Sequence, residues 1–453
     1  MRRATHFDFW TDKLRRSLLL DSKADLLVYG MAERPLLEAA QRLRTAASTA
    51  EGGRATRPLA GIRGTVIARG QSDESGQCDR PDRVWVPLPS HEEIEADPTK
   101  LMAATLLLER QVHGGSAWVT QATQGRTLVF APPPEPFATD ELDALYALPF
   151  ARAPHPSYRE PIPAVEMIQF SVTTHRGCAG GCSFCALAQH QGRRIRSRSR
   201  ESILAEVGRL AAHPKWKGSL SDVGGPSANM WGAACTSDPA TCRRVSCLHP
   251  DICPYFKADQ QALAELLSAL AKVPGVKHVR TSSGVRHDLA LSDDAYVAAL
   301  VGEFTGGQLK LAPEHCTERV LRLMRKPAFA AFEQFLTLFE RVSRKAGKEQ
   351  YVVPYLLSAF PGCTEADMHA LARWLRDRGW KPQQVQCFIP TPGTVATAMY
   401  CSGIDPEGHT IPVARTDAER MRQHAILVPE WGAGESRQCP PSRPGRRAKP
   451  RDP

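Results

Sequence analysis

The sequence lacks any apolar run long enough to span a membrane, and its first residues do not resemble a signal peptide. A membrane-spanning helix needs about 20 consecutive apolar residues, and no stretch of the 453-residue chain approaches that length. The start of the chain is rich in arginine and contains acidic residues, whereas a secretory signal continues into an apolar core. These absences argue against an integral membrane protein and a secreted protein, and we expect a cytoplasmic one.

The composition is that of a soluble globular protein. Hydrophobic residues make up 42% of the chain and charged residues 23%, and 453 residues allow two or three domains with ample core. The chain contains 13 cysteines. In a chain without an export signal, so many cysteines indicate metal ligation and reduced thiols rather than a disulfide framework.

The net charge of +10 is concentrated at the carboxyl end. Half of it lies in residues 437–453, which contain six basic residues and one acidic residue. The segment is also rich in proline, glycine and serine, so we expect a disordered tail over residues 428–453. A basic tail can bind polyanions non-specifically, but a solvated tail is the simpler interpretation. Nucleic acid is therefore an alternative partner and not the favoured one.

The first 150 residues predict an incomplete α/β domain, because helical and strand-like patterns alternate along them. The expected elements are a helix at 9–20, a buried strand at 24–30, a helix at 33–43, short β segments within 56–69 and 83–89, and a helix at 141–147. Several prolines then mark residues 151–165 as a linker into the next domain.

From residue 166 onward, strand and helix patterns alternate repeatedly. The expected strands are 167–173, 220–223, 277–282, 308–311, 350–358 and 384–390. The amphipathic helices between them are expected at 201–212, 259–272, 293–303, 329–346 and 365–378. Six parallel β/α units predict a partial (β/α)6 TIM-like barrel over residues 166–405, with an active site at the carboxyl ends of its strands. A carboxy-terminal extension at 406–427 follows.

A glycine-rich loop with three cysteines follows the first strand of this predicted barrel. Cys178, Cys182 and Cys185 are spaced C-x3-C-x2-C, and three closely spaced thiolates suit a soft metal, above all an iron–sulfur cluster. A cubane cluster has four irons, so three protein thiolates leave one iron open to a small molecule. Zinc is the less well matched alternative, because structural zinc sites have four ligands, commonly from two paired knuckles.

A second group of four cysteines lies in an insertion at residues 230–256, after the second predicted strand. Cys235, Cys242, Cys247 and Cys253 share this loop, and four thiols in one loop favour a bound metal over ordinary reduced cysteines. Their irregular spacing matches no standard zinc knuckle, so an auxiliary iron–sulfur cluster and a structural zinc stay open as alternatives. For the scattered cysteines, core packing or exposure is the simplest interpretation; these are Cys78, Cys316, Cys363, Cys387, Cys401 and Cys439.

Polar residues follow the next predicted strands, where the active site of a barrel would lie. Gly224 and Gly225 expose backbone groups to a ligand, with a plain turn as the alternative. Ser283 follows the third strand and is a candidate for ligand contact. Glu314 and His315 follow the fourth strand and form either an acid–base pair or a surface salt bridge.

The densest basic run of the folded part follows the cysteine loop. It consists of Arg193, Arg194, Arg196, Arg198 and Arg200. One interpretation is that the run steers an anionic substrate toward the mouth of the barrel. The other is a solvated lead into the helix that begins near Glu201, with Ser199 as the helix cap.

The cysteine spacing, with the aromatic Phe184 just before the third cysteine, resembles the signature of radical S-adenosylmethionine (SAM) enzymes. Longer segments are similar to the YgiQ family of radical SAM proteins; they are residues 10–17, 147–156, 222–230, 346–351 and 390–400. The match extends from near Met1 to about Leu427.

This resemblance implies a radical SAM enzyme whose substrate is unknown. The three cysteines at 178, 182 and 185 would ligate a 4Fe–4S cluster, and SAM would bind the open iron. The family cleaves SAM to a 5′-deoxyadenosyl radical that abstracts hydrogen. Phe184 would pack near the adenine of SAM, Gly224 and Gly225 would hold its methionine part, and Ser283 is a further candidate for SAM binding. An electron donor such as flavodoxin or ferredoxin is expected.

The chain also departs from the family pattern. Pro226 stands where relatives have an acidic residue, and no Asp-x-His-x-x-Gly motif is present, so cobalamin is not predicted. Relatives carry further residues upstream, in an α/β domain similar to cobalamin-binding modules, and Val428 begins a stretch unlike the family. We interpret the chain as a truncated or frame-shifted gene product. The alternative functions are a radical SAM enzyme that modifies RNA and a non-catalytic, metal-stabilised nucleic-acid-binding protein.

Overall fold

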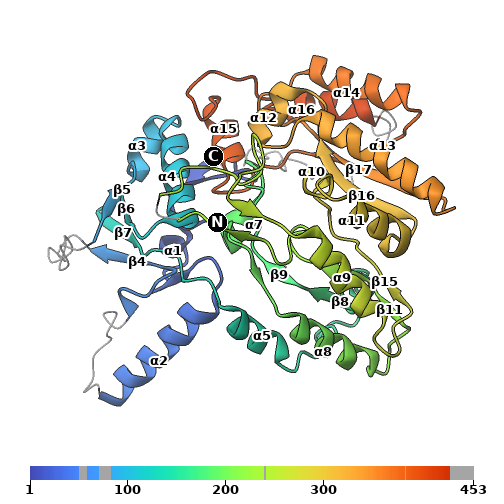
Figure 1. The fold of residues 1–453 in the computed structure, drawn as a ribbon. Coiled ribbons are helices and arrows are strands. Elements are labelled where there is room, and N and C mark those ends of the chain that lie inside the picture. The colour runs from blue at the N-terminus through green and yellow to red at the C-terminus, as the bar shows by residue number, and fades with distance from the viewer. Residues whose placement is uncertain (50–58, 71–82, 239–240, 383, 429–453) are drawn as a thin grey trace.

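The computed structural model describes residues 1–49, 59–70, 83–238, 241–382 and 384–428 (Figure 1). Apart from Val428, the predicted disordered tail lies outside the described residues, and so do Cys78 and Cys439. In the described ranges, no helix combines the length and the apolar character that a membrane crossing requires.

A five-stranded sheet with the order β3–β4–β7–β6–β5 forms the centre of the amino-terminal part. Its strands are β3 (Leu27–Val28), β4 (Thr65–Gly70), β5 (Trp85–Pro87), β6 (Trp118–Thr123) and β7 (Arg126–Phe130). All neighbouring strands pair antiparallel except β5 and β6. The two-residue turn Gln124–Gly125, with positive φ at both positions, reverses the chain from β6 into β7.

The mostly antiparallel pairing does not confirm the expected similarity to a cobalamin-binding module. A doubly wound α/β module has a mostly parallel sheet, because each strand is followed by a crossover helix. Here β6 and β7 are joined by a tight hairpin, and β4 pairs antiparallel with both β3 and β7. The helices of this part are α2 (Glu33–Thr49), α3 (His91–Ala96), α4 (Lys100–Gly114) and α5 (Thr139–Ala147).

The helix predicted at residues 9–20 is wrong. The structure has a hairpin of β1 (His6–Asp8) and β2 (Lys13–Arg15), followed by the short helix α1 (Leu18–Asp21). The turn is fixed by Asp12, whose φ of 53° is left-handed, and by a 2.6 Å hydrogen bond from the Thr11 hydroxyl to Asp8. Short polar side chains stabilise such turns locally, in competition with the helix that the apolar spacing suggests.

The central part is built on parallel strands that follow one another in chain order. These strands are β8 (Ser171–Thr173), β11 (Ser219–Leu220), β12 (Asp222–Gly224), β15 (His278–Val279), β16 (Gln308–Glu314), β17 (Tyr351–Ser358) and β18 (Gln384–Cys387). β8 pairs with β12, β11 with β15, and β16 with β17, which pairs with β18. An isolated parallel bridge between Val285 and Leu311 connects the segment after β15 to β16.

Helices lie along these strands and bury one large apolar core (Figure 1). They are α8 (Arg200–Ala211), α9 (Gln260–Ala271), α10 (His287–Ala290), α11 (Asp294–Ala299), α12 (Glu318–Met324), α13 (Phe329–Lys345), α14 (Glu365–Asp377), α15 (Val395–Ser402) and α16 (Asp417–Leu427). The predicted cap of α8 is confirmed, because the Ser199 hydroxyl accepts the N–H of Ser202 at 3.0 Å.

Two of the predicted elements in this part are altered. The first half of the strand expected at 167–173 is the helix α6 (Ala164–Ile168), where Met167 and Ile168 are exposed rather than buried. The helix expected at 293–303 ends as α-helix at Ala299 and continues as a π-helical turn, Leu300–Phe304. Apolar runs alone do not distinguish these short alternatives.

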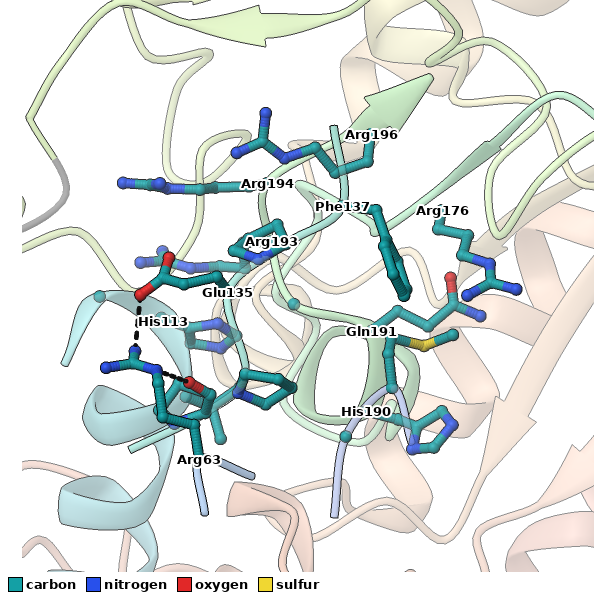
Figure 2. A pocket seen from close by; sticks show the side chains of 18 of the residues that line it. Arg63, His113, Glu135, Phe137, Arg176, His190, Gln191, Arg193, Arg194 and Arg196 are labelled. Carbon is teal, nitrogen blue, oxygen red and sulfur yellow. Dashed lines mark hydrogen bonds and ion pairs between the residues drawn. The ribbon is translucent and has the colours of Figure 1, made fainter. Parts of the chain in front are cut away.

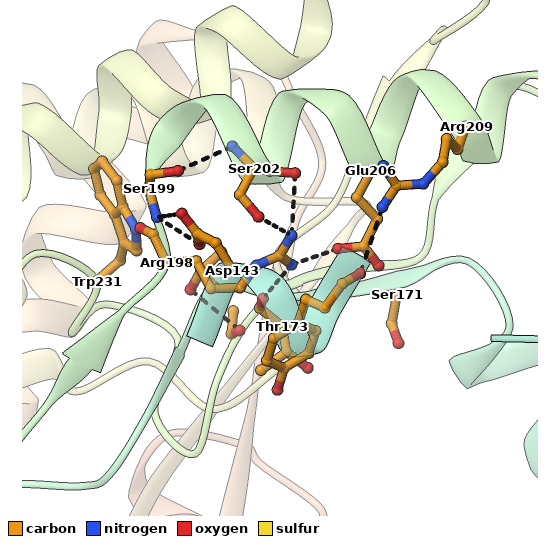
Figure 3. Close-up of polar contacts among 12 residues, drawn as sticks. Asp143, Ser171, Thr173, Arg198, Ser199, Ser202, Glu206, Arg209 and Trp231 are labelled. Carbon is orange, nitrogen blue, oxygen red and sulfur yellow. Dashed lines mark hydrogen bonds and ion pairs between the residues drawn. The ribbon is translucent and has the colours of Figure 1, made fainter. Parts of the chain in front are cut away.

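A buried ion pair anchors β8, the strand that leads into the cysteine loop (Figure 3). Arg198 forms an ion pair with Glu206 of α8, and the two side chains are 0% and 4% exposed. Arg152 pairs with the other carboxylate oxygen of Glu206. Arg198 also donates to the carbonyl oxygen of Thr173 at 2.9 Å. Arg152 donates to the carbonyl oxygen of Ser171 at 2.8 Å, so both arginines bridge α8 and β8.

Replacing Glu206 by Gln should lower the free energy of unfolding by about 3 kcal/mol, because it leaves two buried guanidinium groups without their carboxylate. Urea denaturation measures this difference. The control is Arg341→Gln, which breaks a pair with Asp294 whose side chains are 66% and 71% exposed. That change should alter stability by less than about 1 kcal/mol. Equal effects of the two substitutions would contradict the anchoring role.

Candidate active site

The loop from Gly177 to Cys185 follows β8 and is held in place by its own backbone. The N–H of Cys178 donates to the carbonyl oxygen of Gly192 at 3.1 Å, and the N–H of Cys185 donates to that of Cys182 at 3.1 Å. Gly177 has a φ of 92°, and a Cβ at this position would collide with the carbonyl oxygen of Arg194. Glycine is therefore required where the loop passes the segment that follows it.

Gly180 leaves room between the first two cysteine sulfurs. A Cβ at Gly180 would lie 3.5 Å from Sγ of Cys178 and 3.6 Å from Sγ of Cys182. Nη1 of Arg286 would lie 3.2 Å from the same Cβ, so both thiols and this guanidinium face one small space beside Gly180. The third thiol, Cys185, belongs to the same neighbourhood: burial is the main cause that raises its pKa, and the nearby Cys182 and Cys178 raise it further.

Two buried cations lie beside these thiols. Nη1 of Arg286 is 4.0 Å from Sγ of Cys182, and the same guanidinium forms two hydrogen bonds with Asp288, at 2.9 and 2.6 Å. Lys326 is 6% exposed, and its Nζ lies 3.8 Å from Oε1 of Glu314. The charges of Arg286 and Lys326 favour the thiolate form of Cys178, so this site offers positive charge to anionic sulfur.

Without metal, burial favours the protonated form of Cys178 and Cys185. Burial is the main cause that raises the pKa of Cys178, and it raises the pKa of Cys185 to about 12. Metal ligands must be deprotonated, so metal binding here would release protons. In the part of the chain that the structure describes, no three His, Cys, Asp or Glu side chains converge as ligands of one metal ion. Three neighbouring cysteines with cations beside them, two of whose sulfurs face one space, suit an iron–sulfur cluster, whereas a structural zinc takes four ligands.

The structure brings the predicted glycines and Ser283 together at the carboxyl end of β12. A Cβ at Gly225 would lie 2.6 Å from the buried ring of His175, and a Cβ at Gly224 would lie 3.4 Å from Cβ of Ser283. Asp222 accepts the backbone N–H of Ser283 at 2.9 Å and its hydroxyl hydrogen as well. The sequence analysis missed Asp222, although an acidic residue at the end of a predicted strand was a usable signal.

Phe184 packs against an aromatic residue that follows the carboxyl end of β17. Its ring meets that of Phe360, after β17, edge to face at a centroid distance of 6.2 Å. The preceding residue, Ser183, donates its hydroxyl hydrogen to the carbonyl oxygen of Leu323 at 2.7 Å and accepts the N–H of Ala396 at 2.9 Å. The loop is thus tied to both α12 and α15.

Glu314 and His315 do not interact with each other. Nδ1 of His315 accepts the N–H groups of Cys316 and Thr317, both at 3.0 Å, and Nε2 lies 3.6 Å from Sγ of Cys363. Burial lowers the pKa of His315 to about 4, so it is neutral at pH 7. Glu314 has a φ of 66°, and burial raises its pKa while Lys326 opposes that shift. The surface salt bridge considered for this pair is therefore wrong.

The second cysteine group lies against the first. Its insertion is bracketed by the antiparallel pair β13 (Ala234–Cys235) and β14 (Phe256–Lys257). The N–H of Cys247 donates to the carbonyl oxygen of Ala179 at 3.0 Å, and the N–H of Cys253 donates to that of Cys247 at 2.7 Å. Burial, with the other three thiols of the group as a smaller cause, raises the pKa of Cys247 to about 11. All four cysteines are thus neighbours.

The basic run separates into two parts. Arg198 is buried in the ion pair with Glu206, so a steering role for this residue is wrong. Arg193, Arg194 and Arg196 instead line a cavity that faces the amino-terminal part. Of the scattered cysteines that the structure describes, Cys363 and Cys387 are buried and Cys316 and Cys401 are half-buried, as core packing predicts.

Comparisons with known proteins identify the family of the chain. The family described as Radical SAM N-terminal matches residues 1–171, and the Radical SAM superfamily matches residues 172–375. A UPF0313 protein of Geobacter sulfurreducens is 49% identical over 434 residues, which cover 94% of this chain and 69% of the relative. A UPF0313 protein of Methanosarcina acetivorans is 41% identical over 450 residues, which cover 94% of this chain and 60% of the relative.

Among solved structures, the chain is similar to the radical SAM methyltransferase TsrM from Kitasatospora setae with cobalamin and a 4Fe–4S cluster bound. The TM-score is 0.42 and the identity 14%, and the match covers 82% of this chain and 53% of that chain. A likeness of this size does not extend to the function or the ligands of TsrM.

Gly225→Ala should lower the free energy of unfolding by about 1–3 kcal/mol, because the new methyl group would overlap the ring of His175. The control is Gly208→Ala in α8, where a Cβ meets no atom within 4 Å. That substitution should raise stability by about 0.5–1 kcal/mol through helix propensity. Chemical denaturation measures the change in the free energy of unfolding for both variants. An unchanged stability of Gly225→Ala would contradict the close approach of Gly225 to the ring of His175.

Proposed function

The chain belongs to the UPF0313 (YgiQ) family of the radical SAM superfamily, whose enzymes use a 4Fe–4S cluster and SAM, and we propose that Cys178, Cys182 and Cys185 are its cluster ligands. SAM would take the open iron, and the reaction would begin with hydrogen abstraction from a substrate whose identity is unknown. The observation that carries this assignment is the pair of sulfurs facing the space above Gly180, next to a buried guanidinium.

Charge balance supports the assignment. A cluster held by three thiolates carries net negative charge, which increases on reduction, and burying such charge is expensive unless it is paired. Arg286 and Lys326 provide the positive charge, and Asp288 and Glu314 hold these cations in position through their own contacts. When bound, the cluster supplies one electron for the reductive cleavage of SAM.

We further propose that the parallel strands form the partial (β/α)6 barrel and that SAM lies across their carboxyl ends. The cysteine loop follows β8, Gly225 follows β12, Ser283 follows β15, and Glu314 ends β16. These four positions lie at the same ends of neighbouring parallel strands. In this arrangement Asp222 orients Ser283, Gly224 and Gly225 present backbone groups to SAM, and the ring of Phe184 offers an apolar surface to its adenine.

Glu314, rather than His315, is our candidate for proton transfer. Both ring nitrogens of His315 are engaged by local groups, and burial keeps the ring neutral. Glu314 lies at a strand end beside Lys326, and burial raises its pKa, so this carboxyl holds a proton more readily than an exposed one does.

For the second cysteine group we propose an auxiliary iron–sulfur cluster rather than a structural zinc. The spacing of these four cysteines matches no standard zinc knuckle, in which ligands are paired two to four residues apart, and this favours the cluster. The four thiols are neighbours. Their loop contacts the first cysteine loop through the hydrogen bond from the N–H of Cys247 to the carbonyl oxygen of Ala179.

The alternatives receive less support. Membership of the radical SAM superfamily weighs against a non-catalytic nucleic-acid-binding protein. The basic charge indicates an RNA substrate only weakly, because half of that charge lies in residues 437–453. In addition, Arg198 forms a buried ion pair with Glu206 and is not available to RNA. A cytoplasmic location and an electron donor such as flavodoxin or ferredoxin remain predictions.

Anaerobic reconstitution with iron and sulfide should load the parent protein with two clusters. Cys182→Ala and Cys247→Ala should each bind about half of the parent's iron, and only Cys182→Ala should lose 5′-deoxyadenosine formation with dithionite and SAM entirely. Cys401→Ala, at a half-buried cysteine outside both groups, is the control and should match the parent. Full iron content and full SAM cleavage in Cys182→Ala would refute the ligand assignment.

Lys326→Met should make the cluster harder to reduce. Removing a buried positive charge disfavours the more negative reduced state, so the reduction potential should fall by about 59 mV or more, a tenfold change in a one-electron equilibrium. A redox titration followed by EPR measures this shift. Lys326→Arg keeps the charge and should retain most of the potential, and Lys272→Met, at the end of α9, should not change it. An unaltered potential in Lys326→Met would contradict the charge argument.

A further inference from the structure

A cavity of about 370 Å³ lies between the amino-terminal part and the segment that follows the cysteine loop (Figure 2). Its walls include Arg63, His113 and Phe137 from the amino-terminal part. Arg193, Arg194 and Arg196, which follow the short helix α7 (Leu187–Gln191), complete the opposite wall. None of these residues is a proposed ligand of either cluster, so the cavity is a separate site.

The cavity has an excess of positive charge. Arg63 pairs with Glu135 at 2.8 Å. In contrast, Arg193, Arg194 and Arg196 form no salt bridge with any described residue. Six arginines line the cavity against two acidic residues, Glu135 and Asp238, and Glu135 partly offsets the charge of Arg196. The excess of positive charge would attract an anion into this space.

Several buried polar atoms in the cavity wall have no hydrogen-bond partner. Arg193 is only 9% exposed, and its Nε has no acceptor among the described residues. The same holds for Nε of Arg196 and for both ring nitrogens of His113. A buried donor that lacks an acceptor costs about 1–3 kcal/mol, so a ligand rich in oxygen acceptors would relieve several such costs at once.

We propose that this cavity binds a phosphorylated small molecule, with its phosphate held by Arg193, Arg194 and Arg196. Guanidinium groups bind phosphate through two parallel hydrogen bonds, which gives both affinity and orientation. His113 would add a neutral hydrogen-bonding group. Phe137 and the prolines at 133, 134 and 136 provide an apolar wall for the organic part of the ligand. The volume falls in the range of small-molecule sites, about 300–1,000 Å³.

The site is connected to the cysteine loop through the backbone. The side-chain oxygen Oε1 of Gln191 accepts the N–H of Gly177 at 3.0 Å, and the carbonyl oxygen of Gly192 accepts that of Cys178 at 3.1 Å. The arginine segment follows directly, and Nη1 of Arg193 donates to the carbonyl oxygen of Arg244 in the second cysteine insertion. A ligand that orders this segment would therefore also stabilise the loop that precedes it.

Isothermal titration calorimetry of the reconstituted protein tests the proposal with three probes: inorganic phosphate, ribose 5-phosphate and ribose. We expect both phosphate compounds to bind and ribose not to bind. Tighter binding of ribose 5-phosphate identifies a phosphate ester as the ligand class, and equal binding identifies the phosphate group alone as the recognised feature. Both results support an anion site, whereas equal binding of ribose, or no binding of either phosphate at millimolar concentration, overturns it.

The double variant R194Q/R196Q should weaken binding of the phosphate compounds by about tenfold or more, equivalent to about 1.4 kcal/mol. The matched control R341Q/R344Q removes two positive charges from the exposed face of α13 and should leave the affinity within about twofold. The variant R194K/R196K keeps the charge but loses the paired hydrogen bonds, and should bind with intermediate affinity. If R194Q/R196Q binds phosphate as the parent does, the assignment is wrong. None of these outcomes depends on the cluster ligands proposed above.

Discussion

The candidate active site depends on placing positive charge next to three half-buried cysteines. Arg286 and Lys326 meet this need, and the rest of the site follows from holding them there. Lys326 comes directly after Arg325, whose left-handed backbone ends α12 and whose guanidinium pairs with buried Glu109 of α4 at 2.7 Å. The amino-terminal part therefore helps to fix the residue that carries the lysine. On the other side, the buried pair of Arg198 and Glu206 fixes the strand that leads into the loop.

The sequence predicted the local features of this site and missed the long-range ones. The cysteine loop after β8 and the long amphipathic helices α9, α13 and α14 follow from spacing and periodicity, which are local properties. Arg286 and Lys326 carried no such signal, because they reach the cysteines only through the packing of strands more than 100 residues downstream. The helix expected at 9–20 failed for the opposite reason: a short polar turn at Asp12 outweighed an apolar pattern. The role of Arg198 was invisible in sequence, since a run of arginines does not show which member will be buried.

The region behind the cysteine loop contains two features to which membership of the family gives no role: the second cysteine group and the arginine-lined cavity. The insertion with the second cysteine group contacts the loop through Ala179, and Arg193 reaches the insertion from the other side through Arg244. Arg193, Arg194 and Arg196 also close the cavity against the amino-terminal part. The second set of thiols and the arginine-lined cavity are thus each linked by hydrogen bonds to the first cysteine loop or to the segment that follows it. Binding at any one of them would change the order of the others, which is a physical route for coupling a ligand to the cluster.

The most direct test of the central assignment is the EPR spectrum of the reduced, reconstituted protein recorded with and without SAM. If Cys178, Cys182 and Cys185 hold a cluster with an open iron, SAM binds that iron and changes the g-values of the signal, and the change is absent in a protein whose first cysteine group has been removed. A spectrum that SAM leaves unchanged, in a protein with full iron content, would show that no open iron is accessible to SAM and would contradict the account.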